Sequence, residues 1–379
     1  MKENKRIGRK ERYDEFWDIG AKLMESGMAI ADLYRYFSKV EEKPNPQEKA
    51  SSPRRKAFSL TEERRREIED FAGKTSNGEF TVFKELPRMI APYIAGNEEM
   101  KLALCYSLAS TYEKPIHLLF IGNPASVKSD LLTEVKSIFP EAVLGGPRST
   151  EAGLTIDTLS GSPGLLILAN HGLALIDEMD KIKKSEINAT YEALESGRIS
   201  INTAKVKGEY ETKFTCIAAA NPKGGIFGTE STKMREQIEA VISPPLLSRF
   251  HLVFLLRKES KEKVEDAIKL ILTRKEKSNP NRDYVRDYFE LIRRRSVPVE
   301  YDFDKDSPLI KEMSQFVVDA LNKSEKNEIC IPLTKRAAEA LKRISISSAR
   351  LRMSKRVEEI DVRNAMKIMK IAFETATST

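Results

Sequence analysis

The sequence predicts an α/β protein in which a parallel β-sheet with helices is followed by a domain made of helices alone. Up to residue 257, apolar runs of strand length alternate with segments of helical periodicity. Two of these runs end in polar sequences typical of a phosphate site. From Lys258 onward the apolar residues recur only at helical spacing. We therefore expect an α/β domain over residues 58–257 and a helical domain over residues 258–379.

The composition of the 379-residue chain indicates a protein large enough for two or three domains. With 64 basic and 57 acidic side chains the net charge is +7, which suits a polyanionic partner but is equally ordinary for a solvated helical protein. Its three cysteines and three histidines lie far apart, so we expect reduced thiols and no zinc site. No apolar run reaches about 18 residues, and no apolar core follows the basic N-terminus. We expect a cytoplasmic, nucleoid-associated protein without a membrane span.

The first 57 residues are set apart by their charges and prolines. Residues 1–12 are rich in lysine and arginine. The rest of the helical segment 1–40 carries apolar side chains at helical spacing, interrupted at Gly27. Two helices beside a basic tail are compatible with a helix-turn-helix DNA reader. A helical hairpin that packs on its own chain or on a neighbour is the simpler interpretation, because nothing marks a recognition face. Residues 41–57 are predicted to be a linker.

A loop of eight residues has a sequence typical of phosphate binding. It follows the apolar run 116–121 and leads into a helical pattern that includes Leu131. Backbone N–H groups converge in such a loop, and the next helix adds the positive end of its dipole, so the two attract a polyphosphate. The lysine of the loop would contact the β- and γ-phosphates of ATP, and the serine after it would bind Mg²⁺. The predicted cofactor-binding residues of the loop are Gly122, Asn123, Pro124, Ala125, Ser126, Val127, Lys128 and Ser129.

This loop departs from the usual pattern G-x-x-x-x-G-K-[ST], because Val127 replaces the second glycine. If the position required a positive φ angle, a β-branched residue there would cost about 1–2 kcal/mol. A penalty of that size would weaken ATP binding about tenfold without abolishing it. A loop that keeps the shape but has lost the nucleotide is the alternative.

A pair of carboxylates follows the apolar run 173–176, downstream of the phosphate loop. In a nucleotide hydrolase such a strand delivers the first carboxylate, Asp177, to the metal ion and the second, Glu178, to the water that attacks the γ-phosphate. An isolated acidic pair at the end of a strand is more often a solvated turn. The position of this pair within an alternating β/α pattern favours the metal and general-base roles.

A hairpin is predicted next, with arms at 198–201 and 213–217 and a turn region that holds Lys205 and Lys207. The second arm leads through three alanines to Asn221 and a proline. An amide at the tip of a central strand, beside the carboxylate strand, would orient the attacking water or sense the γ-phosphate. Read alone, an Asn-Pro pair is only a turn.

Three polar residues are predicted to open helices. Thr61 is expected to cap a charged helix with Glu62 and Glu63 in its first turn, and Thr334 and Asp361 to open the last two helices. Short polar side chains at such positions accept hydrogen bonds from the free N–H groups of the first turn.

Five stretches between Phe58 and Ala372 form a combined pattern. Two of them, an alanine-rich run ending in Asn-Pro and a run ending in Leu-Leu-Ser-Arg-Phe, are far more specific than a phosphate loop. The stretches are 90–96 (IAPYIAG), 122–129 (GNPASVKS), 175–181 (LIDEMDK), 217–222 (IAAANP) and 243–250 (SPPLLSRF). Together and in this order they resemble the AAA+ motor domain of the minichromosome maintenance (MCM) replicative helicases. The resemblance implies a P-loop AAA+ ATPase domain followed by a helical lid.

The resemblance also implies a hexameric ring of identical subunits with ATP at each boundary. Arg249 aligns with the arginine finger of the family, which reaches the γ-phosphate bound by the next subunit, and Arg336 aligns with the second sensor arginine. An arginine finger contributes about 10³–10⁵ in rate, so hydrolysis should require assembly. A surface salt bridge is the alternative for either arginine. The implied catalytic residues are Glu178, Asn221, Arg249 and Arg336, with ATP and Mg²⁺ as cofactors and Ser129 and Asp177 as metal ligands.

The chain departs from the family pattern where the family contacts DNA. The DNA-contacting lysine of the pore hairpin falls on Thr203, and Lys205 and Lys207 lie close enough to grip phosphates instead. A long hairpin insertion of the family corresponds to the shorter stretch 156–167. The family's amino-terminal oligonucleotide-binding and zinc portion and its carboxy-terminal winged helix have no counterpart in these 379 residues.

Three functions are compatible with these observations. The first is a DNA-dependent ATPase motor, a minimal MCM-like ring that moves along single- or double-stranded DNA. The second is a degenerate relative with weak or no ATPase activity that acts structurally or in regulation, which Ala125, Val127 and Thr203 favour. The third is a protein-remodelling AAA+ ATPase of the magnesium-chelatase type, which would not be expected to carry the stretch 243–250.

Overall fold

The computed structural model describes residues 58–124, 127–146, 153–156, 162–202, 207–257, 279–295 and 298–377, together with parts of a helix between 265 and 273. All of them belong to the compact unit Ser52–Thr379. Some sequence predictions fall outside the described residues: the N-terminal helices, the linker, Ala125, Ser126, Thr203 and Lys205.

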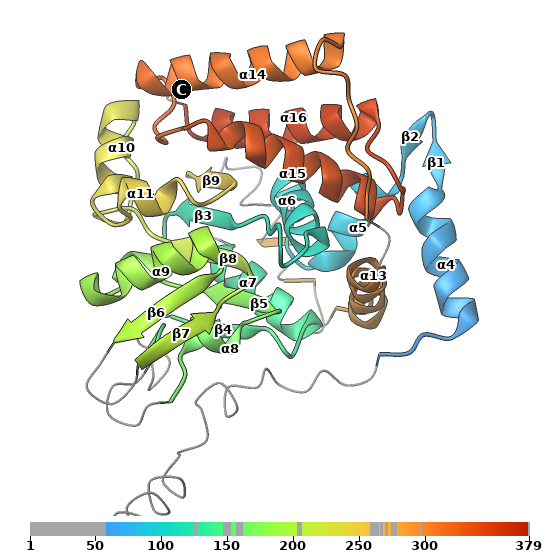
Figure 1. The fold of residues 1–379 in the computed structure, drawn as a ribbon, viewed down its shortest axis with the longest axis horizontal. Helices are drawn as coiled ribbons and strands as arrows, with labels where there is room; N and C mark the ends of the chain where they lie inside the picture. The colour runs from blue at the N-terminus through green and yellow to red at the C-terminus, as the bar shows by residue number, and fades with distance from the viewer. Residues whose placement is uncertain are drawn as a thin grey trace, which may run out of the picture. The chain divides into compact units, whose positions relative to one another are not determined.

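A five-stranded sheet lies at the centre of the described structure (Figure 1). Its order across the sheet is β4-β5-β8-β3-β9, and all neighbouring strands run parallel. The strands are β3 (Leu118–Gly122), β4 (Val143–Gly145), β5 (Leu173–Ile176), β8 (Thr215–Ala220) and β9 (Leu252–Leu256). The predicted α/β fold with a parallel sheet is confirmed. Strand β8 separates the strand before the phosphate loop from the strand before the acidic pair.

The central strands are buried on both faces, which explains why they appear in the sequence as continuous apolar runs. Every residue of β3 and of β8 is buried. Leu118 and Phe120 join one large hydrophobic cluster, whereas Leu119 and Ile121 between them point to the other face.

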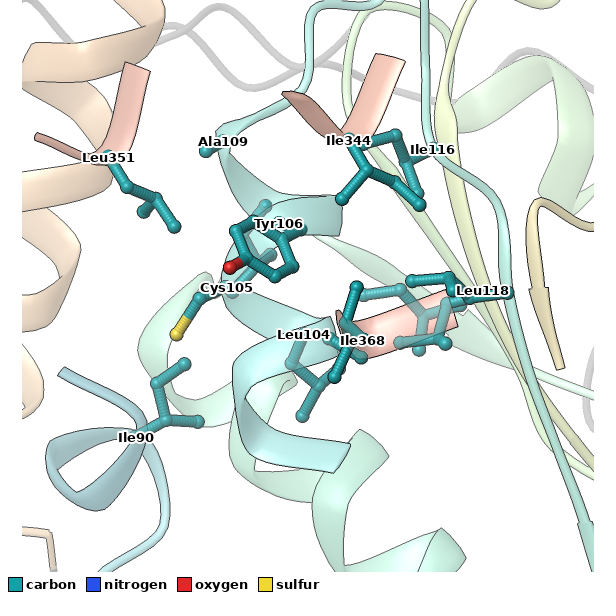
Figure 2. Packing of buried hydrophobic residues seen from close by; sticks show 14 of the residues in the cluster. Ile90, Leu104, Cys105, Tyr106, Ala109, Ile116, Leu118, Ile344, Leu351 and Ile368 are labelled. Atoms are coloured by element: carbon teal, nitrogen blue, oxygen red, sulfur yellow. The ribbon is translucent and has the colours of Figure 1, made fainter. Parts of the chain in front are cut away.

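The hydrophobic cluster joins the sheet to helices that follow it in the sequence. Helix α6 (Glu98–Ala109) lies between β3 and the last two helices, α15 (Arg336–Leu351) and α16 (Glu359–Thr375). In Figure 2, Tyr106 of α6 lies close to Leu118 of β3, Ile344 of α15 and Ile368 of α16. The α/β part and the helical part therefore share one core.

Further helices surround the sheet and extend the helical part (Figure 1). Helix α7, which follows the phosphate loop, contacts several strands, and α13 packs against α5, α6 and α7. The remaining helices are α4 (Glu62–Gly73), α5 (Val82–Ile90), α7 (Lys128–Ile138), α8 (Leu165–Leu168), η1 (Met179–Lys181), α9 (Lys184–Ser196), α10 (Ser231–Glu239), α11 (Pro244–Leu247), α13 (Arg282–Arg294) and α14 (Pro308–Glu325). A small hairpin, β1 (Thr75–Ser76) with β2 (Glu79–Phe80), follows α4.

The hairpin after the acidic pair differs from the prediction. Strand β6 (Arg198–Asn202) pairs with β7 (Lys207–Glu211), and Ile199 lies opposite Tyr210. Lys207 therefore lies in the second strand and not in the turn, and the predicted second arm at 213–217 was wrong. Residues 215–217 belong to β8, whose two edges are already occupied by β3 and β5, so they leave no edge for a hairpin partner.

The predicted helix starts are correct to within three residues. The Thr61 hydroxyl oxygen accepts a hydrogen bond from the backbone N–H of Arg64 at 3.2 Å, as a helix cap does. Helix α15 begins with Lys335 as its cap, one residue after the expected Thr334. Helix α16 is capped by Glu358, and Asp361 completes the capping box from inside the helix.

The three cysteines are free and buried, in agreement with the expectation of reduced thiols. Burial raises the pKa of each of them, so none is an activated thiolate. Within the described part of the chain, no helix has both the length and the apolar character needed to cross a membrane.

Two buried histidines connect the beginnings of β8, β3 and β9. Nδ1 of His117 accepts a hydrogen bond from the backbone N–H of Cys216 at 3.1 Å, and Nδ1 of His251 accepts one from the backbone N–H of His117 at 3.0 Å. Burial, with a smaller contribution from the charge of Arg343, lowers the pKa of His117 to about 3. Burial, followed by the effects of His117 and Arg343, also lowers the pKa of His251 well below its usual range. Both rings are neutral acceptors.

We expect these histidines to make the protein acid-sensitive below about pH 6.5, the ordinary pKa of an unfolded histidine. Below that pH the unfolded chain binds protons that the folded chain does not, so the free energy of unfolding falls by about 1.4 kcal/mol per pH unit for each histidine. Urea denaturation across about pH 7 to 5 measures this slope. His117→Asn should lower the stability at neutral pH and flatten the slope. Equal slopes for the wild type and His117→Asn would contradict the assignment.

Candidate active site

The phosphate loop is anchored where β3 meets β9. A Cβ atom on Gly122 would lie 2.6 Å from Cβ and 2.7 Å from the carbonyl oxygen of Leu256, so only glycine fits at the end of β3. The backbone N–H of Asn123 donates to the same carbonyl oxygen at 3.4 Å, which holds the loop against β9. Helix α7 then begins at Lys128.

Val127 does not strain the loop. Its φ and ψ angles are −60° and −2°, so φ is negative and the backbone is right-handed. The side chain packs against the main hydrophobic cluster. The strain considered for a β-branched residue at this position is therefore absent.

Lys128 is held inside the loop by backbone oxygens. Its Nζ donates to the carbonyl oxygens of Gly122 and Asn123, each at 2.8 Å. Burial lowers the pKa of this lysine to about 8, against the opposing influence of the Asp177 and Asp180 charges. Because the ammonium group is already largely removed from water, little further desolvation is needed when it binds an anion. Phosphate oxygens can then replace the two carbonyl oxygens as its hydrogen-bond acceptors.

Asp177 and Glu178 follow β5 at a sharp turn. The Asp177 carboxylate accepts a hydrogen bond from the backbone N–H of Glu178 at 2.9 Å. Glu178 has a left-handed backbone with φ 53° and ψ 41°, a conformation uncommon for residues other than glycine. Its partly exposed carboxylate pairs with Lys181 in the next turn.

Asn221 is tied to the acidic turn by a residue that sequence reasoning missed. Its backbone N–H donates to the Asp180 carboxylate at 2.9 Å, which links the end of β8 to the turn after β5. The third acid in the sequence Asp-Glu-Met-Asp was the available signal. A second link joins the segment after β8 to the phosphate loop. Asn123 Oδ1 accepts a hydrogen bond from the backbone N–H of Phe227 at 3.3 Å.

The parallel register brings three of the predicted site residues to one edge of the sheet. Ile121 lies opposite Ala220, and Ile176 lies opposite Ala218, so β3, β8 and β5 end together. Lys128, Asp177 and Asn221 follow these carboxyl ends, the usual location of a ligand in a parallel sheet.

The two predicted arginines lie at the other edge. Arg249 precedes β9, whose Leu252 pairs with Leu118 at the beginning of β3, and it is only 6% exposed. Arg249 and Arg336 both bind Oε1 of Glu195, at 2.5 Å and 2.9 Å. All three side chains line a cavity of about 290 Å³. One copy of the chain therefore does not bring its arginines to its own phosphate loop.

The carboxyl edge fits a magnesium nucleotide. The N-terminus of α7 and Lys128 offer N–H donors and a positive charge to phosphate oxygens. The exposed Ser129 hydroxyl and the Asp177 carboxylate are hard oxygen ligands of the kind that Mg²⁺ prefers. When bound, the metal ion would neutralise charge on the β- and γ-phosphates.

A phosphate loop after β3, an acidic pair after β5 and an asparagine after the strand between them, followed by a helical lid, define a P-loop ATPase fold of the AAA+ class. Residues 67–275 match the family model described as the MCM P-loop domain, and residues 283–373 match the MCM AAA-lid domain. The chain belongs to the MCM family, which confirms the resemblance found in the sequence.

Individual relatives agree with this assignment. The minichromosome maintenance protein MCM of Saccharolobus solfataricus is 30% identical over 370 residues, which cover 92% of this chain and 51% of the relative. The DNA replication licensing factor MCM5 of Arabidopsis thaliana is 29% identical over 327 residues, or 78% of this chain and 44% of the relative. The licensing factor MCM7 of the same plant is 27% identical over 386 residues, or 93% and 50%. This chain spans about half the length of these relatives.

The lowered pKa of Lys128 predicts that ATP binding weakens at alkaline pH. The free lysine loses its charge above about pH 8, and a bound polyphosphate favours the charged form, so binding takes up a proton there. The dissociation constant for ATP should rise about tenfold between about pH 7 and 9, measured with a fluorescent analogue. Lys128→Arg, charged throughout this range, should show no such rise. An equal rise in the Lys128→Arg variant would point to another group.

Proposed function

We propose that the chain is an ATP-hydrolysing motor that acts on DNA during replication, as a ring of identical subunits with one ATP at each boundary. The main support is the separation of the site residues. Lys128 lies at the carboxyl edge of the sheet and Arg249 at the amino edge, so a complete site needs two copies arranged head to tail. We also propose the domain limits 58–257 and 258–379 and a cytoplasmic, nucleoid-associated location.

In the proposed mechanism each group has a distinct task. Lys128 and the start of α7 hold the β- and γ-phosphates, and Ser129 and Asp177 hold the metal ion. Glu178 accepts a proton from the attacking water, whose position Asn221 fixes. Arg249 and Arg336 of the neighbouring copy then stabilise the charge that develops on the phosphoryl group. The proposed catalytic and ATP-binding residues are therefore Lys128, Ser129, Asp177, Glu178, Asn221, Arg249 and Arg336.

The proposal predicts that ATP turnover depends on residues from both edges. Lys128→Ala, Glu178→Gln and Arg249→Ala should each lower kcat by about 10³ or more, because each removes a separate requirement of phosphoryl transfer. Only Lys128→Ala should also weaken equilibrium binding of ATP to the single subunit. Phosphate release and particle mass are measured together, and an Arg249→Ala protein with full turnover would exclude a shared site.

The hairpin β6–β7 is the proposed DNA contact. Lys207 is the exposed first residue of β7, where it pairs with Asn202 of β6. The hairpin projects from the body of the molecule (Figure 1). A lysine at such a position can bind a phosphate as a flexible point charge. We propose that Lys205, two residues before Lys207 in the sequence, contributes in the same way.

Stimulation by DNA tests this assignment. Lys205→Ala combined with Lys207→Ala should reduce the stimulation of ATP turnover by single-stranded DNA and lower the salt dependence of DNA binding, because phosphate contacts release counterions. Basal turnover without DNA should stay the same. Lys326→Ala with Lys370→Ala, at exposed lysines of the helical part, is the matched control. Unchanged stimulation in the hairpin variant would remove these lysines from the DNA site.

A non-motor relative is the second candidate, supported by Ala125 and Val127 in the phosphate loop and by the short stretch 156–167. The relaxed backbone at Val127 weakens this candidate, because the loop carries no strain at that residue. Equilibrium binding discriminates between the two. No binding at millimolar ATP would favour a structural or regulatory role.

A further inference from the structure

The predicted arginines of the subunit boundary share one counter-ion that the sequence did not indicate. Arg249, which precedes β9, and Arg336, the first residue of α15, both donate from Nη2 to Oε1 of Glu195 at the end of α9. These elements are far apart in the chain. A single carboxylate oxygen therefore holds the two guanidinium groups close to each other.

Arg249 is held by more than this ion pair. Its guanidinium carbon lies 4.1 Å from the centre of the Tyr191 ring, and Nη2 also donates to the Tyr191 hydroxyl. Tyr191 and Glu195 stand one helical turn apart on α9, so one face of this helix holds the arginine from two sides. The Arg249 side chain is only 5% exposed, whereas the Glu195 side chain is 40% exposed.

The held position leaves one donor of Arg249 without a partner. Among the described residues, no acceptor is bonded to its Nε, which is buried. A buried donor without a partner is unfavourable, so an acceptor that reached this Nε would stabilise the side chain further. Arg249, Arg336 and Glu195 together carry two positive charges and one negative charge, so the three groups attract a further anion.

We propose that Glu195 is a positioning residue that holds Arg249 and Arg336 as a pair and presents them to the phosphate bound by the neighbouring copy. The inference rests on the proposed function. It adds a residue that contacts neither ATP nor the attacking water. In the isolated subunit Glu195 neutralises part of the arginine charge and keeps Arg249 folded against Tyr191. In the ring the phosphate oxygens compete for the same N–H groups, and Glu195 keeps both side chains aimed at them.

Removal of the charge of Glu195 tests the proposal. Glu195→Gln keeps the shape of the side chain and an acceptor oxygen, but it should lower kcat about fivefold or more while KM changes less than about twofold, because the loss falls on the transition state. Glu195→Asp, which keeps the charge, should recover part of kcat. Glu339→Gln is the matched control, because Glu339 pairs with Arg343 beside the same cavity and should leave kcat unchanged.

Mixed rings separate an effect on the neighbour from an effect within the subunit. Glu178→Gln copies lack the general base but keep a complete arginine pair, and Glu195→Gln copies have the reverse defect. Mixing the two should restore turnover above the mean of the separate proteins, because some boundaries then combine two intact halves. No recovery would show that Glu195 supports its own phosphate loop and would overturn the proposal.

The result is distinguishable from failure of the proposed function. If Arg249→Ala abolishes turnover but Glu195→Gln has the kcat of the wild type, only the role of Glu195 is wrong. If the wild-type ring does not turn over ATP, or if Arg249→Ala remains fully active, the shared site itself is wrong. Thermal unfolding of each variant, with midpoints equal to that of the wild type, establishes that a lost kcat does not reflect a lost fold.

Discussion

The parallel alignment of β5, β8 and β3 is the constraint on which the remaining features depend. Parallel strands end together, so the phosphate loop, the acidic turn and Asn221 meet at one edge of the sheet, where the side chains of Asp180 and Asn123 link them. The same alignment sends the segment before β9 to the opposite edge. Because the two sets of residues lie at opposite edges of the sheet, the proposed shared site needs two copies arranged head to tail.

Hydrogen bonds between side chains and backbone groups help to keep the site in place. Lys128 is bound by loop carbonyls, Asn221 by the Asp180 carboxylate, and the loop itself by Leu256 and Phe227. Such bonds are short-range and exchangeable. A phosphate group can replace the carbonyl partners of Lys128 without unfolding the loop around it.

The helical part is bound to the sheet through a common core, which has a consequence for motion. Arg336 begins α15, whose Ile344 packs near α6 and β3. Arg249 adjoins β9, which α16 covers. A shift of the last two helices relative to the sheet would therefore move the two arginines against each other, and Glu195 lies between them. Through the arginine pair, the position of the helical lid would affect the proposed ATP site between neighbouring copies.

The sequence by itself predicted most of the elements and indicated a chemistry for each motif. Local patterns suffice for this, because an apolar run, a helical period and a loop such as 122–129 are properties of neighbouring residues. The same logic misplaced the second arm of the hairpin: residues 215–217 have strand character, but strand character does not name the partner strand. Only the tertiary structure assigned β8 to the centre of the sheet and β7 to the hairpin.

The tertiary structure also decided the features that join distant segments. The link from Asp180 to Asn221 and the meeting of Arg249 and Arg336 at Glu195 each depend on contacts between residues separated along the chain. No local period encodes such contacts. They arise because strand order and shared burial bring the segments together, and that order is a property of the packed chain as a whole.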